Sequence, residues 1–517
     1  MMYPVGIQSF EDLRKRGFVY VDKTAILHKL ASIGTYYFLS RPRRFGKSLT
    51  LSTLEAYFKG QKELFEGLAM AELEKEWNVY PVFHFDLNSG LYDSVEALEN
   101  QLNLALLPWE ALYGKGQDEH RPYERLSGLV RRAYEKTGRQ VVILVDEYDK
   151  PILQNLDNPE LQDKMHAILK AFFSVLKTQD RYLRFAFITG VTKFSKVSAF
   201  SDLNNLTDLS LDIRCQALCG ITEKELNDYF STAIAGLAET NGWNTEETRQ
   251  RLKAKYDGYH FSENCMDVYN PFSLLKTFVQ QQISDYWFES GTPTFLVKLL
   301  RENDLSIKEL DSMEMSAEEL GNVDTIFTNP VPVLYQSGYL TIKGYDEESE
   351  LYTLGFPNDE VANGFFKFLV PFYTNENPGQ VASTVNQFVK DIRRGDIDSF
   401  LTRLASFFSG YNYDLIPKHD LERHYQNVIF IVCRLIGFRV EAEYRTSAGR
   451  IDMVLQTQEA IYLFEFKLNV SSTKALKQII QKDYAAQFAS DPRPVIKIGV
   501  NFSSKIRSIT DWKVEQA

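Results

Sequence analysis

The feature that most constrains the fold is a series of short, nearly continuous apolar runs in residues 1–220, each followed by helical sequence. The runs are TYYFL before Ser40, VYPVFHFDL around residue 83, VVILV before Asp146 and RFAFIT before Gly190. A strand covered on both faces needs apolar residues at nearly every position, whereas a half-exposed strand alternates. The pattern therefore predicts an α/β fold, with a parallel sheet between layers of helices.

Composition narrows the class of protein. The chain has 517 residues, of which 44% are hydrophobic and 25% charged, as expected of a globular protein with three or four domains. No run approaches the roughly 18 apolar residues that a membrane span needs, and the N-terminus lacks a signal-peptide pattern. We therefore expect a cytoplasmic protein with no membrane partner. The four cysteines are too scattered to form a disulfide scaffold.

Charge is distributed unevenly along the chain. The net charge of −11 argues against a nucleic-acid-binding surface along the whole chain. Residues 415–517, however, carry 15 Lys and Arg against 11 Asp and Glu, so the rest of the chain carries −15. Only the C-terminal hundred residues have a balance suited to a polyanion.

Changes of pattern divide the chain into three predicted domains, 1–220, 221–410 and 411–517. Near Gly220 the apolar runs give way to helical sequence, which a capping box at Thr222–Glu225 opens. A short hairpin with strands at 339–342 and 351–354 favours a helical, winged-helix-like middle, and more helices follow to about residue 410. From Leu421 a helix, a hairpin, another helix and a strand at 494–500 predict a second α/β unit.

The first candidate site lies in TYYFLSRPRRFGKSLTLSTLEAYF, which predicts a strand, a loop and a helix. Lys47 and Ser48 stand where the helix begins, so backbone N–H groups can meet phosphates there. We expect Lys47 at the β- and γ-phosphates of ATP and the Ser48 hydroxyl on Mg²⁺. Arg41 stands where this P-loop motif has its first glycine. The candidate nucleotide-binding residues are Arg43, Arg44, Phe45, Gly46, Lys47, Ser48 and Leu49.

Acidic residues at the end of VVILV match the Walker B arrangement. Asp146 is expected to hold Mg²⁺ and Glu147 to polarise the attacking water, with Asp149 as the next candidate. Thr189 ends a further strand and is a candidate γ-phosphate sensor or a plain strand-end hydroxyl. Arg184, just before that strand, is a candidate charge stabiliser. A solvated acidic turn is the alternative, but the two motifs at this spacing favour a nucleotide site.

The second candidate site lies in the C-terminal segment GRIDMVLQTQEAIYLFEFKL. Strand alternation places Glu465 and Lys467 on one face, and such a charged pair is unusual inside so apolar a strand. Antiparallel pairing of Asp452 with Glu465 leaves a four-residue loop, Thr457 to Ala460, and brings the three side chains together. Two carboxylates can bind Mg²⁺, which can activate water for phosphodiester cleavage, while the lysine orients it. A salt-bridged surface hairpin is the alternative.

Seven motifs lie between residues 20 and 275, and they include the two nucleotide motifs above: YVDKT (20–24), SRPRRFGKSL (40–49), VDEYDKPI (145–152), TGVTKFSK (189–196), FSDLNNLTDLS (200–210), YDGYHF (256–261) and YNPFSLL (269–275). Together they resemble the AAA-ATPase-like family, whose members resemble STAND-type ATPases and often carry a C-terminal PD-(D/E)XK nuclease-like domain. The family's own RPRRFGKS pattern includes Arg41. In YVDKT, Asp22 and Lys23 can contact nucleotide, or Asp22 can cap a helix.

The spacing of Asp452, Glu465 and Lys467 resembles the Asp…Glu-x-Lys pattern of the PD-(D/E)XK nucleases, which implies a restriction-endonuclease-like fold for residues 411–517. It also implies a role for Glu422, because many of these nucleases carry an additional metal-linked carboxylate at the corresponding place in the preceding helix. Gln478, Lys482 and Tyr484 in the helix after the hairpin could assist or contact phosphates.

The leading hypothesis is therefore an ATP-regulated nuclease with ATP and Mg²⁺ as cofactors and nucleic acid, expected to be DNA, as partner. The alternative is a STAND-like ATP switch whose C-terminal domain binds nucleic acid without cutting it. A metabolic kinase would leave the C-terminal hairpin unexplained. The sequence leaves open whether the protein forms a homo-oligomer.

Overall fold

The computed structural model describes residues 2–194, 206–289, 307, 309–321, 323, 329–374, 379–409, 421–436, 439–446 and 449–516. The chain divides into two compact units, Met1–Asn303 with Leu310–Val361 and Asp304–Glu309 with Ala362–Ala517. None of the described helices is both long and apolar enough to cross a lipid bilayer.

A parallel β-sheet forms the centre of the first unit. Among the described residues it has five strands in the order β2-β3-β4-β1-β5. The strands are β1 (Tyr36–Ser40), β2 (Val82–Asp86), β3 (Val141–Asp146), β4 (Leu183–Gly190) and β5 (Thr207–Asp208). The apolar runs form β1 to β4, which confirms the predicted α/β fold. In register, Ser40 lies beside Gly190 and Asp86 beside Asp146, so the carboxyl ends of these strands share one edge.

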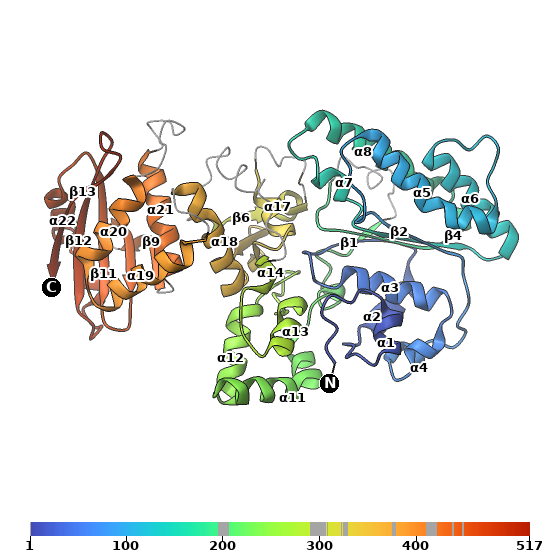
Figure 1. Ribbon diagram of the computed structural model, residues 1–517, viewed down its shortest axis with the longest axis horizontal. Helices are drawn as coiled ribbons and strands as arrows, with labels where there is room; N and C mark the ends of the chain where they lie inside the picture. The colour runs from blue at the N-terminus through green and yellow to red at the C-terminus, as the bar shows by residue number, and fades with distance from the viewer. Residues whose placement is uncertain are drawn as a thin grey trace. The chain divides into compact units, whose positions relative to one another are not determined.

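Helices cover both faces of this sheet (Figure 1). Helix α3 packs against β3 on one face, and α5, α6 and α8 form a layer on the other. Within that layer, the buried Arg125 guanidinium donates to both carboxylate oxygens of Glu110, at 2.7 and 2.6 Å. The helices are α1 (Phe10–Lys15), α2 (Thr24–Ile33), α3 (Lys47–Phe58), α4 (Ala69–Leu73), α5 (Val95–Tyr113), α6 (Pro122–Thr137), α7 (Lys150–Leu153), α8 (Pro159–Phe173) and α9 (Val175–Thr178).

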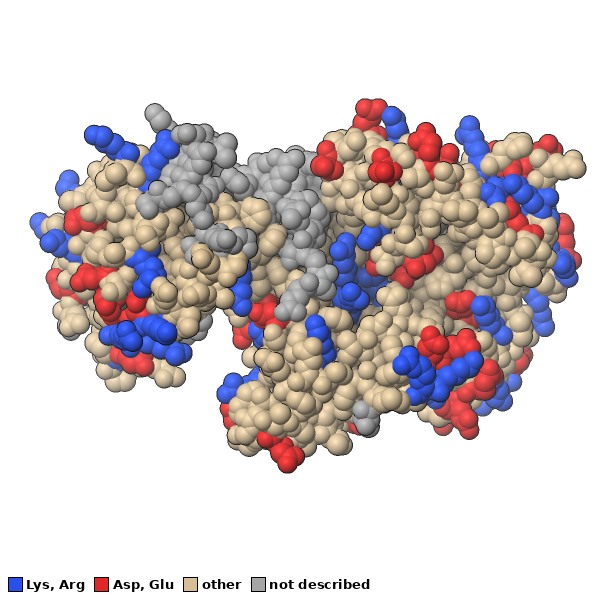
Figure 2. All heavy atoms as spheres, in the orientation of Figure 1, with Lys and Arg blue, Asp and Glu red and all other residues tan. Residues whose placement is uncertain are grey.

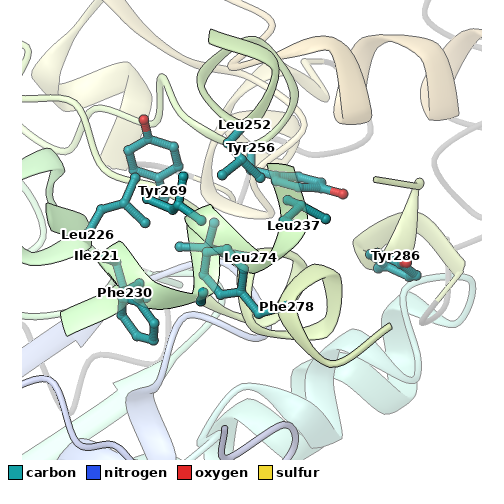
Figure 3. Packing of buried hydrophobic residues seen from close by; sticks show 12 residues of the cluster. Ile221, Leu226, Phe230, Leu237, Leu252, Tyr256, Tyr269, Leu274, Phe278 and Tyr286 are labelled. Atoms are coloured by element: carbon teal, nitrogen blue, oxygen red, sulfur yellow. The ribbon is translucent and has the colours of Figure 1, made fainter. Parts of the chain in front are cut away.

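The helical middle begins at the predicted capping box. The Thr222 hydroxyl accepts from the Glu225 N–H, and the Glu225 carboxylate accepts from the Thr222 N–H. Apolar side chains from successive helices meet in one core, including Phe230, Leu252 and Leu274 (Figure 3). The helices are α11 (Glu223–Asn241), α12 (Thr245–Tyr256), α13 (Pro271–Gln280) and α14 (Tyr286–Glu289).

A small antiparallel sheet completes the first unit. Its strands, in the order β6-β8-β7 among the described residues, are β6 (Glu314–Ser316), β7 (Thr341–Asp346) and β8 (Leu351–Gly355), with helices α16 (Ala317–Gly321) and α17 (Val331–Gln336) beside them. The predicted hairpin is present, but its first strand starts later than expected. The N–H groups of Tyr339 and Leu340 both bond to the Leu334 carbonyl, so these two residues end α17 instead of pairing in the sheet. The winged-helix interpretation stays a prediction.

The second unit contains a mixed sheet with helices on both faces. In the described residues its order is β13-β12-β11-β10-β9, with β11 and β12 parallel and the other pairs antiparallel. Helix α22 covers the face that carries Ile461 and Leu463, and Phe400 of α20 contacts Phe464 on the opposite face. The elements are α18 (Asp359–Tyr373), α19 (Val381–Arg393), α20 (Ile397–Ser409), α21 (Leu421–Leu435), β9 (Arg439–Thr446), β10 (Gly449–Gln456), β11 (Ile461–Leu468), α22 (Ser472–Gln481), β12 (Val495–Ser503) and β13 (Ser508–Gln516).

Glu360→Gln is expected to make the stability of the protein less sensitive to pH. Burial raises the pKa of Glu360 to about 7, and hydrogen bonds from the Trp287 N–H and the Ser273 hydroxyl offset this only in part; Lys255 lowers the pKa and Asp285 raises it. Between about pH 4.5 and 7 the folded state therefore binds more protons than the unfolded state, and stability falls as pH rises, by up to about 3 kcal/mol in total. From pH 5 to pH 8 the thermal midpoint of the variant should rise relative to that of the wild type. If the two midpoints change in parallel with pH, the raised pKa of Glu360 is contradicted.

Candidate nucleotide and metal sites

The phosphate loop joins the end of β1 to the start of α3. Ser40 ends the strand, and the helix begins at Lys47, with Gly46 at its N-cap. Gly46 has φ 96° and Arg44 has φ 68°, so the loop takes two left-handed steps before the helix. That conformation costs a non-glycine residue roughly 1 kcal/mol or more, and such residues are concentrated at ligand sites.

Arg41 explains why the loop lacks its first glycine. Arg41 is 1% exposed, and its guanidinium donates to the carbonyls of Ser40 and Ser210 at 2.8 Å and of Cys215 at 3.3 Å. It also lies 4.1 Å from the centre of the Phe261 ring. Arg41 therefore anchors the loop to the protein interior, and the substitution leaves the phosphate side of the loop unobstructed.

The carboxylates at the end of β3 and just after it, Asp146 and Asp149, have different partners. Asp146 is 5% exposed, and its Oδ1 accepts a hydrogen bond from the Thr189 hydroxyl at 2.6 Å, so the two predicted site residues meet. Asp149 accepts from the N–H groups of Val191 and Thr192 at 3.0 and 2.6 Å. Asp149 thus fixes the segment after β4, which is a structural task that disfavours it as the water-polarising group.

A cavity of about 310 Å³ opens beside the loop. Of the predicted residues, Arg43, Arg44, Gly46, Lys47, Ser48, Leu49 and Glu147 line it. Four of the lining side chains are cationic and one is anionic, since Lys150 also lines it. Figure 2 shows Lys and Arg side chains gathered in a hollow of the first unit. The excess positive charge suits a polyphosphate.

Two side chains around this cavity bear directly on the chemistry. The Lys47 ammonium is held by the carbonyls of Arg41 and Pro42, at 2.9 and 3.1 Å, and is 4% exposed. Glu147 has φ 50°, and burial raises the pKa of its carboxyl, which the Lys47 charge partly offsets. A carboxylate with a raised pKa is a stronger base, as the polarisation of water requires.

Several sequence predictions need correction. Phe45 points into the core, edge-on to the Tyr259 ring at 4.7 Å, so its side chain does not line the cavity. Thr189 is fully buried and reaches Asp146 instead of the cavity, so a direct sensor role is not supported. Arg184 lies at the opposite end of β4 and donates to the Ala31 carbonyl, far from the predicted charge.

The YVDKT motif is also structural in the described chain. Asp22 accepts from the Thr24 N–H at 2.8 Å and from the Ala69 N–H at 2.8 Å, which caps the starts of α2 and α4. Lys23 pairs with Glu225 at 2.5 Å and so connects the N-terminal segment to the start of α11. These contacts favour helix capping over nucleotide contact.

Sequence reasoning missed several residues of the cavity wall. They are Pro4, Val5, Gly6, Ile7, Gln8, Asn88, Lys150, Pro271, Phe272 and Leu275. The position of Asn88 just past the end of β2, at the edge that carries Asp146, was an available signal. The N-terminal segment and α13 gave no local signal, because only the tertiary fold brings them to the loop. Phe272 packs under the Arg44 guanidinium, 5.1 Å from it.

In the C-terminal unit, β10 and β11 pair in the register expected from the sequence. Met453 lies opposite Phe464, and Gln456 opposite Ile461, which leaves the predicted four-residue loop. The same register aligns Asp452 with Glu465, and Asp452 Oδ2 accepts from the Phe466 N–H at 2.8 Å. The Lys467 ammonium donates to Glu465 Oε1 at 2.8 Å. The fold therefore brings together the three predicted residues.

Burial and a neighbouring carboxylate disfavour the charged form of Glu465. Glu465 is 1% exposed, and burial together with the Asp452 charge raises its pKa to about 7, although Lys467 acts in the opposite direction. Within the described residues, Glu465 Oε2 is buried without a hydrogen-bond partner. Such an oxygen is costly to bury unless a ligand satisfies it. An oxygen-binding cation such as Mg²⁺ fits this pair of carboxylates.

Gln478 of α22 and Tyr484, just past the end of that helix, contact β11 and β10 beside the site. Gln478 donates to Glu465 Oε1, and the Tyr484 hydroxyl donates to the Arg450 carbonyl at 2.8 Å. Glu422 lies in the first turn of α21, but its side chain is outside the described residues. Within the described residues no group of three or more His, Cys, Asp or Glu side chains gathers.

Comparisons with known proteins agree with this geometry. Residues 4–200 match the family model described as predicted AAA-ATPase, and residues 420–512 match the PD-(D/E)XK nuclease superfamily. A curated protein of Azotobacter chroococcum mcd 1, described as an uncharacterized protein in the vnfD 5′ region, is 36% identical over 525 residues. The match covers 99% of this chain and 98% of that protein.

Proposed function

Since this chain belongs to the AAA-ATPase-like family and carries a C-terminal domain of the PD-(D/E)XK nuclease superfamily, we propose that it hydrolyses ATP and cleaves nucleic acid. The first unit binds ATP with Mg²⁺ at the phosphate loop. The C-terminal domain cleaves phosphodiester bonds, with DNA as the expected substrate. Nucleotide state controls the nuclease.

In the ATPase half, each residue has a defined task. The four cations of the cavity wall attract the triphosphate, and Lys47 at the start of α3 turns from the loop carbonyls to the β- and γ-phosphates. Ser48 and Asp146 hold the Mg²⁺, with the Asp146 carboxylate oriented by the Thr189 hydroxyl. Glu147 orients and deprotonates the attacking water. Bound Mg²⁺ offsets the negative charge that develops on the phosphoryl oxygens.

In the nuclease half, the buried and unsatisfied Glu465 oxygen beside Asp452 is the observation that carries the proposal. Glu465 and Asp452 hold the cation, and Glu422 is a further candidate ligand. Lys467, held at 2.8 Å from Glu465, orients water or stabilises charge on the phosphate. Bound Mg²⁺ lowers the pKa of a water molecule so that it can attack phosphorus.

The direct test uses purified protein with labelled ATP, Mg²⁺ or Mn²⁺, and single- and double-stranded DNA and RNA. Release of phosphate and metal-dependent cleavage of at least one polymer are expected. If nucleotide binds and no polymer is cut under any of these conditions, the STAND-like switch replaces the nuclease proposal. If nucleic acid is not bound at all, both nucleic-acid proposals fail.

Lys47→Ala is expected to weaken ATP binding at least about tenfold, or roughly 1.4 kcal/mol, because the loop loses the ammonium at the start of α3. Titration calorimetry with Mg·ATP measures the affinity. Lys59→Ala, at the other end of the same helix and paired with Glu55 on the surface, is the matched control and should bind normally. Unchanged affinity in a folded Lys47→Ala protein would refute the assignment of the loop.

A further inference from the structure

The phosphate loop is held by side chains of the helical middle. The Trp287 indole N–H donates to the Arg43 carbonyl at 3.0 Å, and the ring is 7% exposed. At the neighbouring loop residue, Pro42 packs against Gly338 so closely that a Cβ at 338 would lie 2.6 Å from the Pro42 Cβ. A shift of the loop at Pro42 and Arg43 must therefore displace Trp287 or break its hydrogen bond.

Trp287 is connected in turn to a buried carboxylate. Its backbone N–H donates to Glu360 Oε1 at 2.8 Å, and the Ser273 hydroxyl donates to the same oxygen at 2.9 Å. Ser273 follows Phe272, which lines the nucleotide cavity. Glu360 thus receives one hydrogen bond from the residue that holds the loop and another from the residue that follows Phe272 of the cavity wall.

The second carboxylate oxygen of Glu360 makes the hydrogen bonding of this residue sensitive to movement of its two donors. Glu360 is fully buried, and its Oε2 has no hydrogen-bond partner among the described residues. Burial raises its pKa to about 7. A buried carboxylate that depends on two donors is destabilised if either donor moves, because the lost hydrogen bond cannot be replaced by water.

Glu360 stands at the point where the chain leaves the first unit. It is the second residue of α18, which starts at Asp359, and the second unit resumes at Ala362 within the same helix. The start of α18 is therefore fixed by Trp287, which also holds the phosphate loop, and by Ser273, which follows a residue of the cavity wall. The remainder of the helix belongs to the unit that carries the nuclease-like site.

We infer that Trp287 and Glu360 couple nucleotide occupancy of the phosphate loop to α18 and thereby regulate the C-terminal unit. The inference rests on the proposed ATP site and assigns its regulatory output. ATP that draws the loop toward its phosphates shifts the Arg43 carbonyl, Trp287 follows, and the hydrogen bonding of Glu360 at the start of α18 changes. The two residues act as positioning residues and do not touch the reacting atoms.

Hydrogen exchange tests this coupling without requiring cleavage. Amide exchange of residues 359–373 is measured by mass spectrometry with and without a non-hydrolysable ATP analogue, after calorimetry has shown binding. In the wild type, the analogue should change the exchange rate of the first turns of α18 by at least about threefold. Trp287→Phe keeps an aromatic ring against Tyr339 but lacks the N–H donor, and should lose most of this response. Trp243→Phe, whose ring contacts Arg251, is the matched control and should respond like the wild type.

Each outcome decides the question. If the wild type binds the analogue and α18 exchange does not change, the coupling is refuted even if Trp287→Phe fails to fold. If Trp287→Phe binds the analogue and responds fully, Trp287 is not the link and the inference is wrong. If the wild type does not bind the analogue, calorimetry detects the failure of the ATP proposal separately, and the inference falls with it.

Discussion

Asp452→Asn is expected to lower Mg²⁺-dependent cleavage of nucleic acid by at least about a hundredfold. An amide can still accept the hydrogen bond that Asp452 receives from the Phe466 N–H, so the pairing of β10 with β11 should persist. What the variant loses is the negative charge of Asp452, which lies beside Glu465 and its buried, unsatisfied oxygen. Cleavage is measured on a labelled polymer over a range of Mg²⁺ concentrations, and nucleic-acid binding is measured in parallel.

The binding measurement separates a catalytic defect from a folding defect. With a negative charge removed, nucleic-acid affinity should stay the same or increase. Lys467→Ala should leave the metal dependence in place but slow cleavage, because the carboxylates remain. Glu515→Gln is the matched control. Glu515 pairs with Lys497 on the edge strand of the same sheet, and its side chain is 42% exposed, so the variant should cut normally. Wild-type cleavage by Asp452→Asn would place the catalytic centre elsewhere.

Glu147→Gln is expected to lower ATP hydrolysis by at least about a hundredfold and to leave ATP binding intact. The side chain keeps its size, but the amide lacks the basic carboxylate oxygen. Burial raises the pKa of this carboxylate, which lines the cavity. Single-turnover phosphate release measures the chemical step, and calorimetry measures binding.

Glu160→Gln is the control for this change, since Glu160 pairs with Lys164 on the surface of α8. Equal phosphate release by Glu147→Gln and the wild type would assign water activation to another group. Asp149 would then be a poor substitute, because its carboxylate is occupied by the Val191 and Thr192 N–H groups.

In the C-terminal sheet, the sequence predicted the interior strands and missed both edge strands. The register of β10 and β11 followed from one alternation pattern and one loop length, and both are local properties. By contrast, β9 and β13 were not expected. They lie at the two edges of their sheet, where a strand such as SITDWKVEQ is only partly buried and needs no apolar run.

The nucleotide site shows the same division between local and tertiary information. The loop conformation and the end of β3 could be predicted, because Gly46, Lys47 and Asp146 belong to short motifs with a fixed geometry. The burial of the Arg41 side chain could not be predicted, because its carbonyl partners at Ser210 and Cys215 come from far along the chain.

The central position of β11 in its sheet affects the order in which the two sheets can fold during synthesis. Glu465 and Lys467 lie on a strand that has β10 on one side and β12, at Val495–Ser503, on the other. The parallel sheet around the phosphate loop is complete by Asp208, so on the ribosome it can fold long before β12 emerges. Until β12 emerges, β11 has a neighbouring strand, β10, on one side only. A nascent chain can therefore form the sheet around the phosphate loop well before it forms the second strand that flanks Glu465 and Lys467.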